Sequence, residues 1–550
     1  MKVALYTRFL YILGVVVLTS CAEKEDLNEA LKEKIVVDAS QFTLSEETYG
    51  KEVEITRANK PKSDIKKIDL GNGIEAEVVV EHDNWKDSSK VRTRAQEISN
   101  QHYTINAFDN SNNLVGTLKG TVSGNGPTKS FVSDAGTPEK LILEPGSYSF
   151  VCFNDKVIFN NNKLIVTDAN ASQALIGRTR TTVSGSKYRV HFEMKHQAAR
   201  VRFQMKTYWK IENITAKIVP AASDPHILTY NSDATGPQYS SSPTSVSKNY
   251  TFPNKTISAS DFVYTSMSDY QYYLPMSKGN EFKLYFQNGE LYEKSLVNKM
   301  MTFDKFPRIQ LAANESYVVK IKLYYTYKYL FSDGTTGTLL QGKAAGKTPI
   351  GVVATDKTSG SEGLAFALKV AGNYRWSNTV TSYQNTQQFI NQIGVAYDEN
   401  GYNWTWNAAY SRTGSAHAND NNFPAFFAAA HYTNSLAAQG ITMTGSITNR
   451  NWFLPSLGEW RRFLIAAAKY DNSMQAVSTW GGHLSHDILD VIYIQAGGMP
   501  ISGSTYQSSS EADADHGYYM GLDFKDKLAW RVAGSNSKLE SWGVIPALHF

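Results

Sequence analysis

The 550-residue sequence is poor in cysteine, in charge and in long apolar runs. Its two cysteines, Cys21 and Cys152, exclude a framework of several disulfides. Charged residues make up 19% of the chain and the formal net charge is +4, which excludes a highly charged disordered chain and the basic surface of a nucleic-acid-binding protein. We therefore expect a globular protein of about two to four domains, with no nucleic-acid partner.

Catalytic motifs are scarce as well. No cysteine follows Cys152, so the rest of the chain has no thiolate nucleophile. The nearest match to a Gly-x-Ser-x-Gly elbow is "GSITN", which lacks the last glycine. The Glu-Pro-Asn and Trp-Asn-Asp motifs of calcium-dependent lectins are absent, and Asp523 with Asp526 is too little for a cage of six to eight oxygens. We expect no enzyme, no catalytic residue and no cofactor, and ligand recognition that needs no calcium.

One stretch has the spacing of metal ligands. In "GGHLSHDILD", His483, His486, Asp487 and Asp490 are three or four residues apart, as a metal site would require. The same letters are also typical of a capped helix or a strand that enters a core. We favour the structural interpretation and predict no metal site.

The first 20 residues form an export signal. Lys2 and Arg8 precede an apolar run over residues 9–18, which is too short for a bilayer that takes about 20 apolar residues to span. The run ends in "LTSC", which resembles the lipobox of bacterial lipoproteins. That resemblance implies that lipoprotein signal peptidase removes residues 1–20 and that Cys21 carries lipid in the outer membrane. A polar tether and N-terminal segment is expected over residues 21–70.

Short alternating apolar segments follow, separated by Gly, Asn, Asp and Ser. Period-two alternation without long helices predicts β-sandwiches, one over residues 71–205 and another over residues 206–329. Cys152 lies in the alternating run "YSFVCFN" and is expected to be a small buried residue. The Ser- and Pro-rich residues 220–256 form either an interdomain loop or an excursion within the second sandwich.

The last part of the chain, residues 330–550, contains helices. In "NWFLPSLGEWRRFLIAAAKY", Ser456 and Glu459 have the spacing of a capping box. The apolar residues after this cap recur at helical intervals and should face a core; they are Leu457, Trp460, Leu464 and Ala467. We predict an α+β domain here.

Several motifs of the first 329 residues resemble the fimbrillin family, the lipoprotein-borne pilins of Bacteroidetes with two Greek-key-type β-sandwich domains. They are the lipobox, "VRTRAQ", "LEPGSYSF", "MKHQAARVRFQM" and "LAANESYVVKIKL". The resemblance implies that a trypsin-like protease releases the first strand, and that a partner subunit completes the opened sandwich with a strand of its own. It places the removed strand at "IEAEVVVEH", residues 74–82, and the cut after Arg94, with Arg92 and Arg57 as alternatives. These arginines are otherwise ordinary exposed loop residues.

The stretches "WFLPSLGEW" and "YQSSSEADADHGYYMGL" resemble a C-type-lectin-like module. "LPSLGEW" also resembles a segment of the sulfatase-modifying formylglycine-generating enzymes, whose chemistry depends on cysteines that this module lacks. The resemblance to fimbrillins also implies that stalk pilins donate a C-terminal strand to a neighbour. A folded module in that position implies a tip or minor subunit of a fimbria at the cell surface. Its ligand, a glycan or a protein, would meet aromatic and polar side chains that follow Thr505, which otherwise belong to core strands. The candidates are Asp513, Asp515, His516, Tyr519 and Trp542.

Two other functions stay open. The chain could be a surface glycan-binding lipoprotein that never polymerises, in which case lipid and the Arg92–Ala95 segment would be retained. A polysaccharide-cleaving enzyme is the third interpretation, and the sequence shows no carboxylate pair for it.

Overall fold

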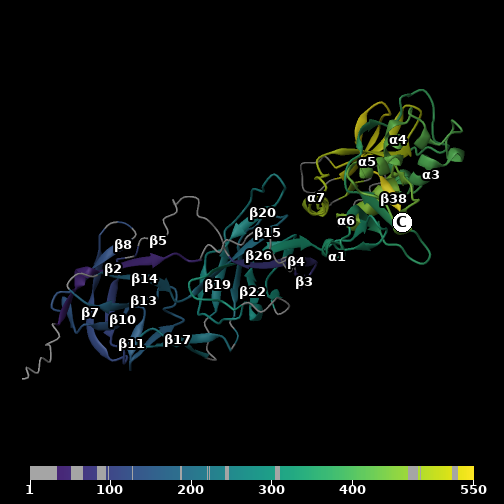
Figure 1. Ribbon diagram of the computed structural model, residues 1–550. Helices are drawn as coiled ribbons and strands as arrows, with labels where there is room; N and C mark the ends of the chain where they lie inside the picture. Colours follow the sequence, from purple (N-terminus) through teal and green to yellow (C-terminus); the bar gives the residue numbers. More distant parts are fainter. Residues whose placement is uncertain are drawn as a thin grey trace, which may run out of the picture.

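The protein is a chain of three structural units, seen here in a computed structural model. The structure describes residues 34–50, 66–82, 95–96, 98, 100–124, 126, 128–185, 189–219, 221, 223–241, 247–303, 310–468, 481–482, 485–522 and 530–550. An N-terminal unit, a middle unit and a C-terminal module follow one another along an elongated molecule (Figure 1). The fold is mainly β, as predicted, and every α-helix of the described chain falls between residues 339 and 495.

The N-terminal unit is built on a sheet that closes on itself. Its strands run in the order β14-β13-β10-β6-β7-β8-β2, and β2 also pairs with β14, so the ring is complete where an open sandwich was expected. Cys152 is buried in β10, as predicted. The strands are β2 (Phe42–Glu47), β6 (His102–Phe108), β7 (Leu114–Ser123), β8 (Thr128–Ser133), β10 (Gly146–Asn154), β13 (Leu175–Val183) and β14 (Val190–His196), with β5 (Ala95–Gln96) paired to the end of β2 and the pair β1 (Ile35–Asp38) and β9 (Lys140–Leu143) as a separate two-stranded sheet.

A small second sheet covers this unit, and half of it comes from later in the chain. Its order is β11-β12-β17-β18, with β11 (Ile158–Asn160), β12 (Lys163–Thr167), β17 (Pro225–Asn231) and β18 (Gln238–Ser241). Leu228 of β17 lies in one apolar cluster with Val151 and Leu164. The part of the Ser- and Pro-rich stretch that forms β17 and β18 is thus an excursion that joins the N-terminal unit, whereas its last part, residues 248–252, joins a sheet of the second unit.

The middle unit is a sandwich of two sheets. One sheet has the order β20-β15-β26-β4-β3 and the other β19-β16-β22-β25. Phe203 of the first faces Tyr250 of the second at 4.7 Å between ring centroids. The strands are β3 (Lys66–Gly71), β4 (Ile74–His82), β15 (Ala199–Thr207), β20 (Tyr264–Met267), β21 (Gln271–Tyr273) on β15, β26 (Ser316–Tyr325), β16 (Ile214–Ile218), β19 (Lys248–Phe252), β22 (Lys283–Asn288) and β25 (Met300–Thr302), plus the hairpin β23 (Glu290–Leu291) and β24 (Lys294–Ser295).

The C-terminal module combines two six-stranded sheets with short helices. The sheet orders are β28-β27-β29-β30-β38-β32 and β31-β37-β34-β35-β36-β33. The first contains β27 (Tyr329–Phe331), β28 (Thr336–Gly337), β29 (Pro349–Thr355), β30 (Leu364–Ala367), β32 (Trp452–Phe453) and β38 (Ala547–His549). The second contains β31 (Gly372–Arg375), β33 (Gly481–Gly482), β34 (Thr505–Glu511), β35 (His516–Gly521), β36 (Trp530–Ser537) and β37 (Ser541–Val544). The helices are α1 (Leu339–Ala344), α2 (Gln392–Val395), α3 (Gly401–Trp406), α4 (Pro424–Ala430), α5 (Tyr432–Ala438), α6 (Leu457–Ala467) and α7 (His486–Gln495).

Helix α6 is the helix that the capping box predicts. The Ser456 N–H donates to the Glu459 carboxylate at 2.7 Å, and the apolar stripe from Leu457 to Ala467 is buried as expected. Trp460 lies 4.9 Å from Phe366 of the sheet between ring centroids, so this helix anchors the module. Among the described residues, each helix is too short or too polar to cross a bilayer.

Two expectations about the chain before residue 206 differ from the structure. The segment expected as a tether over residues 21–70 contains β1, β2 and β3, because its polar letters alternate with buried Val37, Phe42 and Leu44. The expected boundary between residues 205 and 206 falls inside β15, a central strand of the middle unit. Alternation along a strand shows which side chains face a core, but it does not show which sheet the strand joins.

Candidate functional site

Strand β2 closes the main sheet of the N-terminal unit, although it precedes the other strands of that sheet in the sequence. It lies parallel to β14, from the Phe42–Val190 pair to the Glu46–Met194 pair, and antiparallel to β8 on its other side. Phe42 and Leu44 have no exposed surface, and the Phe42 ring lies 5.6 Å from that of Phe150. Without β2, the facing edges of β8 and β14 would expose unpaired N–H and C=O groups beside an apolar core.

The end of β2 is held at the junction of the first two units. Glu46 Oε1 lies 3.0 Å from Nε2 of His196, and the His196 ring stacks on Tyr49 at 4.0 Å between centroids. The Arg200 guanidinium covers Tyr49 at 4.4 Å. Burial raises the pKa of Tyr49, so its hydroxyl stays neutral.

Asn314 fastens the same segment through its backbone and its side chain. The Gly50 N–H donates to the Asn314 carbonyl at 2.9 Å, and the Asn314 amide donates to the Thr48 carbonyl at 3.3 Å. The Asn314 side-chain oxygen accepts from the His196 N–H at 3.2 Å. We call Tyr49, His196, Arg200 and Asn314 the junction latch.

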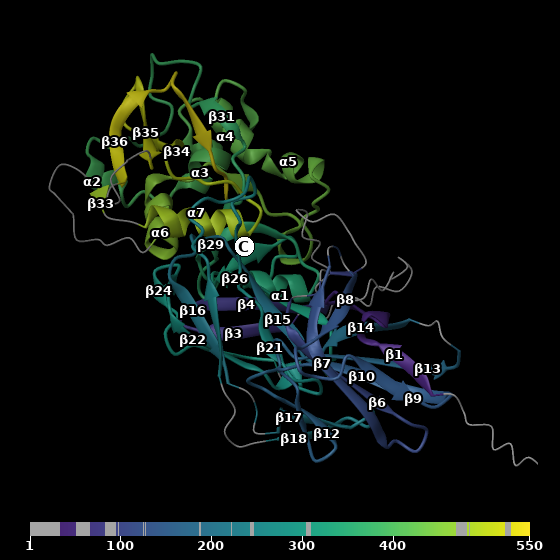
Figure 2. The ribbon, with the colours of Figure 1, turned by 90° about the vertical axis from the view of Figure 1, so that its left-hand side faces the viewer.

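Strand β4, the expected leaving strand, belongs to the middle unit. It pairs antiparallel with β26 over its whole length, from the Ile74–Tyr325 pair to the His82–Tyr317 pair. Ile74, Ala76 and Val78 enter the middle core. The expectation that residues 74–82 form the first strand of the N-terminal sandwich is therefore corrected, and Figure 2 shows the β3–β4 hairpin among the strands of the middle unit.

The outward face of β4 binds the C-terminal module. Glu77 forms an ion pair with Lys343 of α1 at 2.7 Å, and the Thr338 hydroxyl donates to the Glu75 carboxylate at 2.9 Å. Thr338 is also the N-cap of α1. The β3–β4 hairpin therefore connects two units that lie next to each other in Figure 1.

The residues expected for lipid attachment and processing lie outside the described residues. These are Cys21, Arg57, Arg92 and Arg94. Their sequence positions still have a consequence: Arg57 follows β2, whereas Arg92 and Arg94 follow β4. A cut after Arg94 would separate β1 to β4 from the rest, rather than one strand.

The last strands of the middle unit and of the C-terminal module are tied in place, as is the start of the C-terminal module. The Tyr329 hydroxyl donates to the Ile492 carbonyl at 2.7 Å, and the Gln495 amide donates to the Tyr325 carbonyl at 2.8 Å. Strand β38 is an interior strand of its sheet, between β30 and β32. Phe550 exchanges two backbone hydrogen bonds with Gly363, each 3.1 Å long.

The structure separates the five expected ligand residues into two groups. Asp513, Asp515 and His516 share the turn between β34 and β35, where Asp513 Oδ1 accepts from the Asp515 N–H and His516 N–H at 2.9 Å each. Burial alone would raise the pKa of Asp513, but these hydrogen bonds and His516 hold it below its ordinary value. Because the Asp513 carboxylate shapes its own turn, it has less capacity left for a ligand.

Tyr519 and Trp542 form the second group. Their rings stack at 5.7 Å between centroids with 26° between planes, from strands β35 and β37 on either side of β34. Both side chains are half-buried, and the Trp542 indole N–H has no partner in the described part of the chain. The pair is thus a flat, partly accessible aromatic surface on the second sheet.

Of the histidines and aspartates with metal-like spacing, His486, Asp487 and Asp490 belong to helix α7, and His483 lies outside the described residues. Ser485 caps α7 by accepting from the Ile488 N–H at 3.2 Å, so the stretch is a capped helix. Asp490 accepts from the Ile501 and Ser502 N–H groups at 2.8 and 2.9 Å. No cluster of three His, Cys, Asp or Glu suited to a metal occurs in the described ranges.

A buried ion pair supports the loop above the second sheet. Lys538 Nζ lies 2.5 Å from Glu511 Oε1, and neither side chain has exposed surface. The same carboxylate accepts from the Gln384 and Asn385 N–H groups at 2.7 and 2.9 Å. With this many partners, Glu511 is a loop anchor.

No protein-family model and no curated protein matches the sequence. Solved structures of fimbrial and candidate adhesion proteins of Bacteroidetes are similar to it. A candidate cell adhesion protein from Bacteroides uniformis ATCC 8492 is 13% identical, covers 42% of this chain and 93% of its own, and has a TM-score of 0.30. A fimbrial protein from Bacteroides ovatus ATCC 8483 is 14% identical and covers 94% and 100%, with a TM-score of 0.20. The fimbrial anchor protein Mfa2 from Porphyromonas gingivalis is 13% identical and covers 44% and 77%, with a TM-score of 0.21.

These TM-scores are below 0.5, so the functional argument rests on this chain's own contacts. Sequence reasoning missed the junction latch, because its members are far apart in the chain and come together only in the fold. It also missed a polar cavity in the middle unit. The Asn288-Gly289 pair is a sequence signal for a turn at one wall of the cavity, but the hairpin itself turns at Tyr292 and Glu293, which lie between the paired Leu291 and Lys294 of β23 and β24.

Proposed function

We propose that this protein is a tip or minor subunit of a fimbria, exported as an outer-membrane lipoprotein and processed before assembly. The observation that carries the proposal is the insertion of β2 between β14 and β8, from a segment that precedes the rest of its unit in the chain. A strand that lies between two others but comes from a separate, earlier segment can be replaced by a partner's strand through β-augmentation. Other fimbrial subunits are then the partners.

The candidate cuts differ in what they would open. A cut after Arg57 frees β1 and β2 and leaves β3 and β4 in the middle sheet. A cut after Arg92 or Arg94 also frees β4, which exposes one edge of β26 and removes the contacts of Glu75 and Glu77 with the C-terminal module. Burying one large apolar side chain contributes about 1.5–3 kcal/mol, so loss of Phe42 and Leu44 alone leaves a strong drive to accept a replacement strand.

The tip position is supported by the last strands of the middle unit and the C-terminal module, which this protein could not easily donate to a neighbouring subunit. Donating β38 would break its pairing with both β30 and β32, and donating β26 would break its pairing with both β15 and β4. The hydrogen bond from the Gln495 amide of α7 to the Tyr325 carbonyl further joins β26 to the C-terminal module. The protein would therefore accept a strand and end the filament.

The C-terminal module would mediate adhesion, as a C-type-lectin-like module without enzymatic activity. Its support is the placement of β38 beside β30, which joins the two ends of the module, and the accessible Tyr519–Trp542 pair. The ligand is a glycan or a protein. The alternative is a surface glycan-binding lipoprotein that keeps its lipid and never polymerises.

Mass spectrometry of the mature N-terminus from purified cell-surface protein tests the processing step. A terminus at Ala95, Thr93 or Ala58 identifies the cut, whereas an acylated Cys21 on all molecules supports the alternative.

For strand acceptance, the processed protein is titrated with a peptide of residues 34–50, and with a control peptide that carries Phe42→Asp and Leu44→Asp. Binding of the first peptide only is expected; equal binding of both would refute strand complementation. Immunogold staining along the whole shaft, rather than at filament ends, would refute the tip position.

A further inference from the structure

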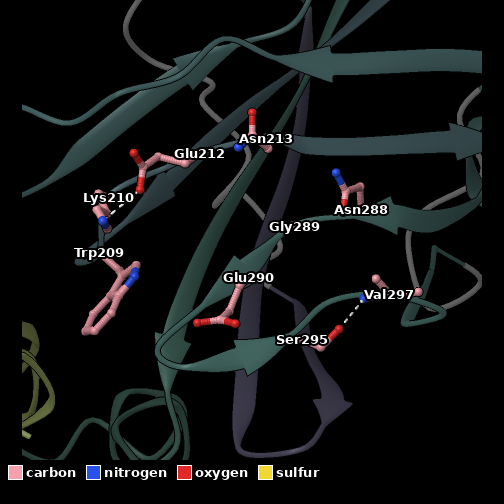
Figure 3. Close-up of a pocket in the computed structure, with 9 residues that line it drawn as sticks. All are labelled: Trp209, Lys210, Glu212, Asn213, Asn288, Gly289, Glu290, Ser295 and Val297. Carbon is pink, nitrogen blue, oxygen red and sulfur yellow. Dashed lines mark hydrogen bonds and ion pairs between the residues drawn. The ribbon is translucent and has the colours of Figure 1, made fainter.

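The middle unit contains a polar cavity at the side that faces the C-terminal module. It has a volume of about 470 Å³ and lies between the loop that follows β15 and the hairpin of β22 to β24. The loop contributes Trp209, Lys210, Glu212 and Asn213, and the hairpin contributes Asn288, Gly289, Glu290, Ser295 and Val297. Figure 3 shows Trp209 and the Lys210–Glu212 pair on one side and Glu290 on the facing hairpin.

The two walls are held in place by buried Tyr292. Its hydroxyl donates to the Leu323 carbonyl at 2.7 Å and accepts from the Tyr208 N–H at 3.1 Å, so the hairpin is bonded to the residue before Trp209. The Tyr292 and Trp209 rings meet edge to face at 5.9 Å. The cavity is therefore formed before any ligand arrives, which lowers the ordering cost of binding.

Gly289 brings the hairpin close to β16. Its φ is +114°, a conformation that favours glycine, and a Cβ there would lie 2.6 Å from Cγ1 of Ile214. The Ser485 hydroxyl donates to Glu293 at 2.6 Å, which ties the same hairpin to the N-terminus of α7. The cavity thus sits where two units meet.

Several polar groups that line the cavity have no partner among the described residues. The Glu290 carboxylate, the Trp209 indole N–H and the Asn288 amide make no hydrogen bond or ion pair within that part of the chain. Lys210 is different, because its ammonium lies 2.8 Å from Glu212 Oε2, and this hydrogen bond raises the pKa of Lys210. The lining therefore offers a donor, an acceptor-only carboxylate and an amide that does both.

We propose that this cavity binds a neutral oligosaccharide. A sugar ring has an apolar face for Trp209, and its hydroxyls can donate to Glu290 and accept from the indole and amide N–H groups. Phosphorylated, sulfated and sialylated ligands are disfavoured, since the one cation is paired and the lining carries one Lys and two Glu, a formal charge of −1. Apolar peptides are disfavoured because Trp209 and Val297 are the only large apolar side chains of the lining. The proposal does not depend on strand complementation.

Saturation-transfer NMR and calorimetry on the full-length protein test the proposal. The probes are lactose and N-acetyllactosamine as animal-type glycans, maltotriose and cellotriose as plant-type glycans, and 3′-sialyllactose as the charged counterpart of lactose. We expect at least one neutral probe to bind. Trp209→Ala and Glu290→Gln should each weaken that binding about tenfold, which corresponds to about 1.4 kcal/mol. Glu290 is exposed on its hairpin, so its substitution leaves the fold intact.

Two further variants separate this site from other surfaces. Tyr239→Ala, at an exposed position of the N-terminal unit, should leave the affinity unchanged. Trp542→Ala tests the aromatic pair of the C-terminal module: loss of binding there, with no effect of Trp209→Ala, would overturn the proposal. Absence of binding by all four neutral probes would also overturn it, as would equal affinity for 3′-sialyllactose and lactose.

Discussion

The replacement Phe42→Ala measures how much strand β2 contributes to the N-terminal unit. Phe42 has no exposed surface, and its ring contacts Phe150 at 5.6 Å and Phe192 at 6.1 Å between centroids. Removing a buried Phe side chain costs about 3–5 kcal/mol, because transfer free energy and a residual cavity add. We expect the free energy of opening β2 to fall by this amount.

Hydrogen–deuterium exchange with mass spectrometry is the suitable assay, because a protein of three units does not unfold as a two-state system. A loss of about 3 kcal/mol accelerates exchange by roughly a hundredfold where opening is required. The acceleration should appear in peptides that cover β2, β8 and β14. Peptides from α6 and β38 in the C-terminal module should exchange as before.

Val36→Ala provides the matched control on the neighbouring strand β1. The Val36 side chain is 47% exposed, so its truncation should change stability by no more than about 0.5 kcal/mol. The reasoning fails if Phe42→Ala accelerates exchange in β8 and β14 by less than about fivefold, which is about 1 kcal/mol. It also fails if exchange rises equally in all three units.

Four further predictions concern the junction latch, the C-terminal module and the ligand. Asn314→Gly keeps the positive φ of +61° but removes the side-chain hydrogen bonds to Thr48 and His196. Because each hydrogen bond contributes about 1 kcal/mol, the amides of residues 48–50 should exchange several-fold faster. An unchanged exchange rate would show that the backbone hydrogen bond from Gly50 to Asn314 suffices. Lys538→Met leaves the buried Glu511 carboxylate without its cation and should destabilise the module by about 3–5 kcal/mol. Thermal melts followed by tryptophan fluorescence measure this loss. Adding Glu511→Gln should restore part of the stability, and no restoration would argue against the ion pair. Burial raises the pKa of Glu459 to about 8, so the folded module holds this proton at pH values where the unfolded chain releases it, near the ordinary pKa of 4.5. Stability should therefore fall as pH rises from about 4.5 to 8. Glu459→Gln should flatten that slope in melting temperatures, and an unchanged slope would contradict the prediction. EDTA should leave ligand binding by the native protein unchanged, and loss of binding that calcium restores would refute calcium independence.

Local patterns in the sequence predicted local structure well. The Ser456–Glu459 spacing identified the start of α6, and the apolar stripe after it is buried around Trp460. The alternation around Cys152 predicted a buried strand residue. These predictions succeeded because capping and burial of one face depend on residues within a few positions of each other.

The pairing of strands that are far apart in the sequence could not be predicted in the same way. Residues 74–82 alternate as clearly as any strand, yet they pair with β26, about 240 residues later in the chain. The five ligand candidates lie within 30 positions of one another, but the fold divides them into a self-bonded turn and an aromatic pair. The cavity beside Trp209 needs two segments that are about 80 residues apart.

The sequence by itself determined that the protein is mainly β, where many of its strands and one central helix lie, and which side chains are buried. It could do so because periodicity and capping are recorded in neighbouring residues. Only the tertiary structure decided that β2 closes the N-terminal sheet, that β4 joins the middle sheet, and that β38 lies between β30 and β32. Those facts depend on which strand edges meet in space, and an alternating strand is compatible with many edges until the remaining strands have taken their places.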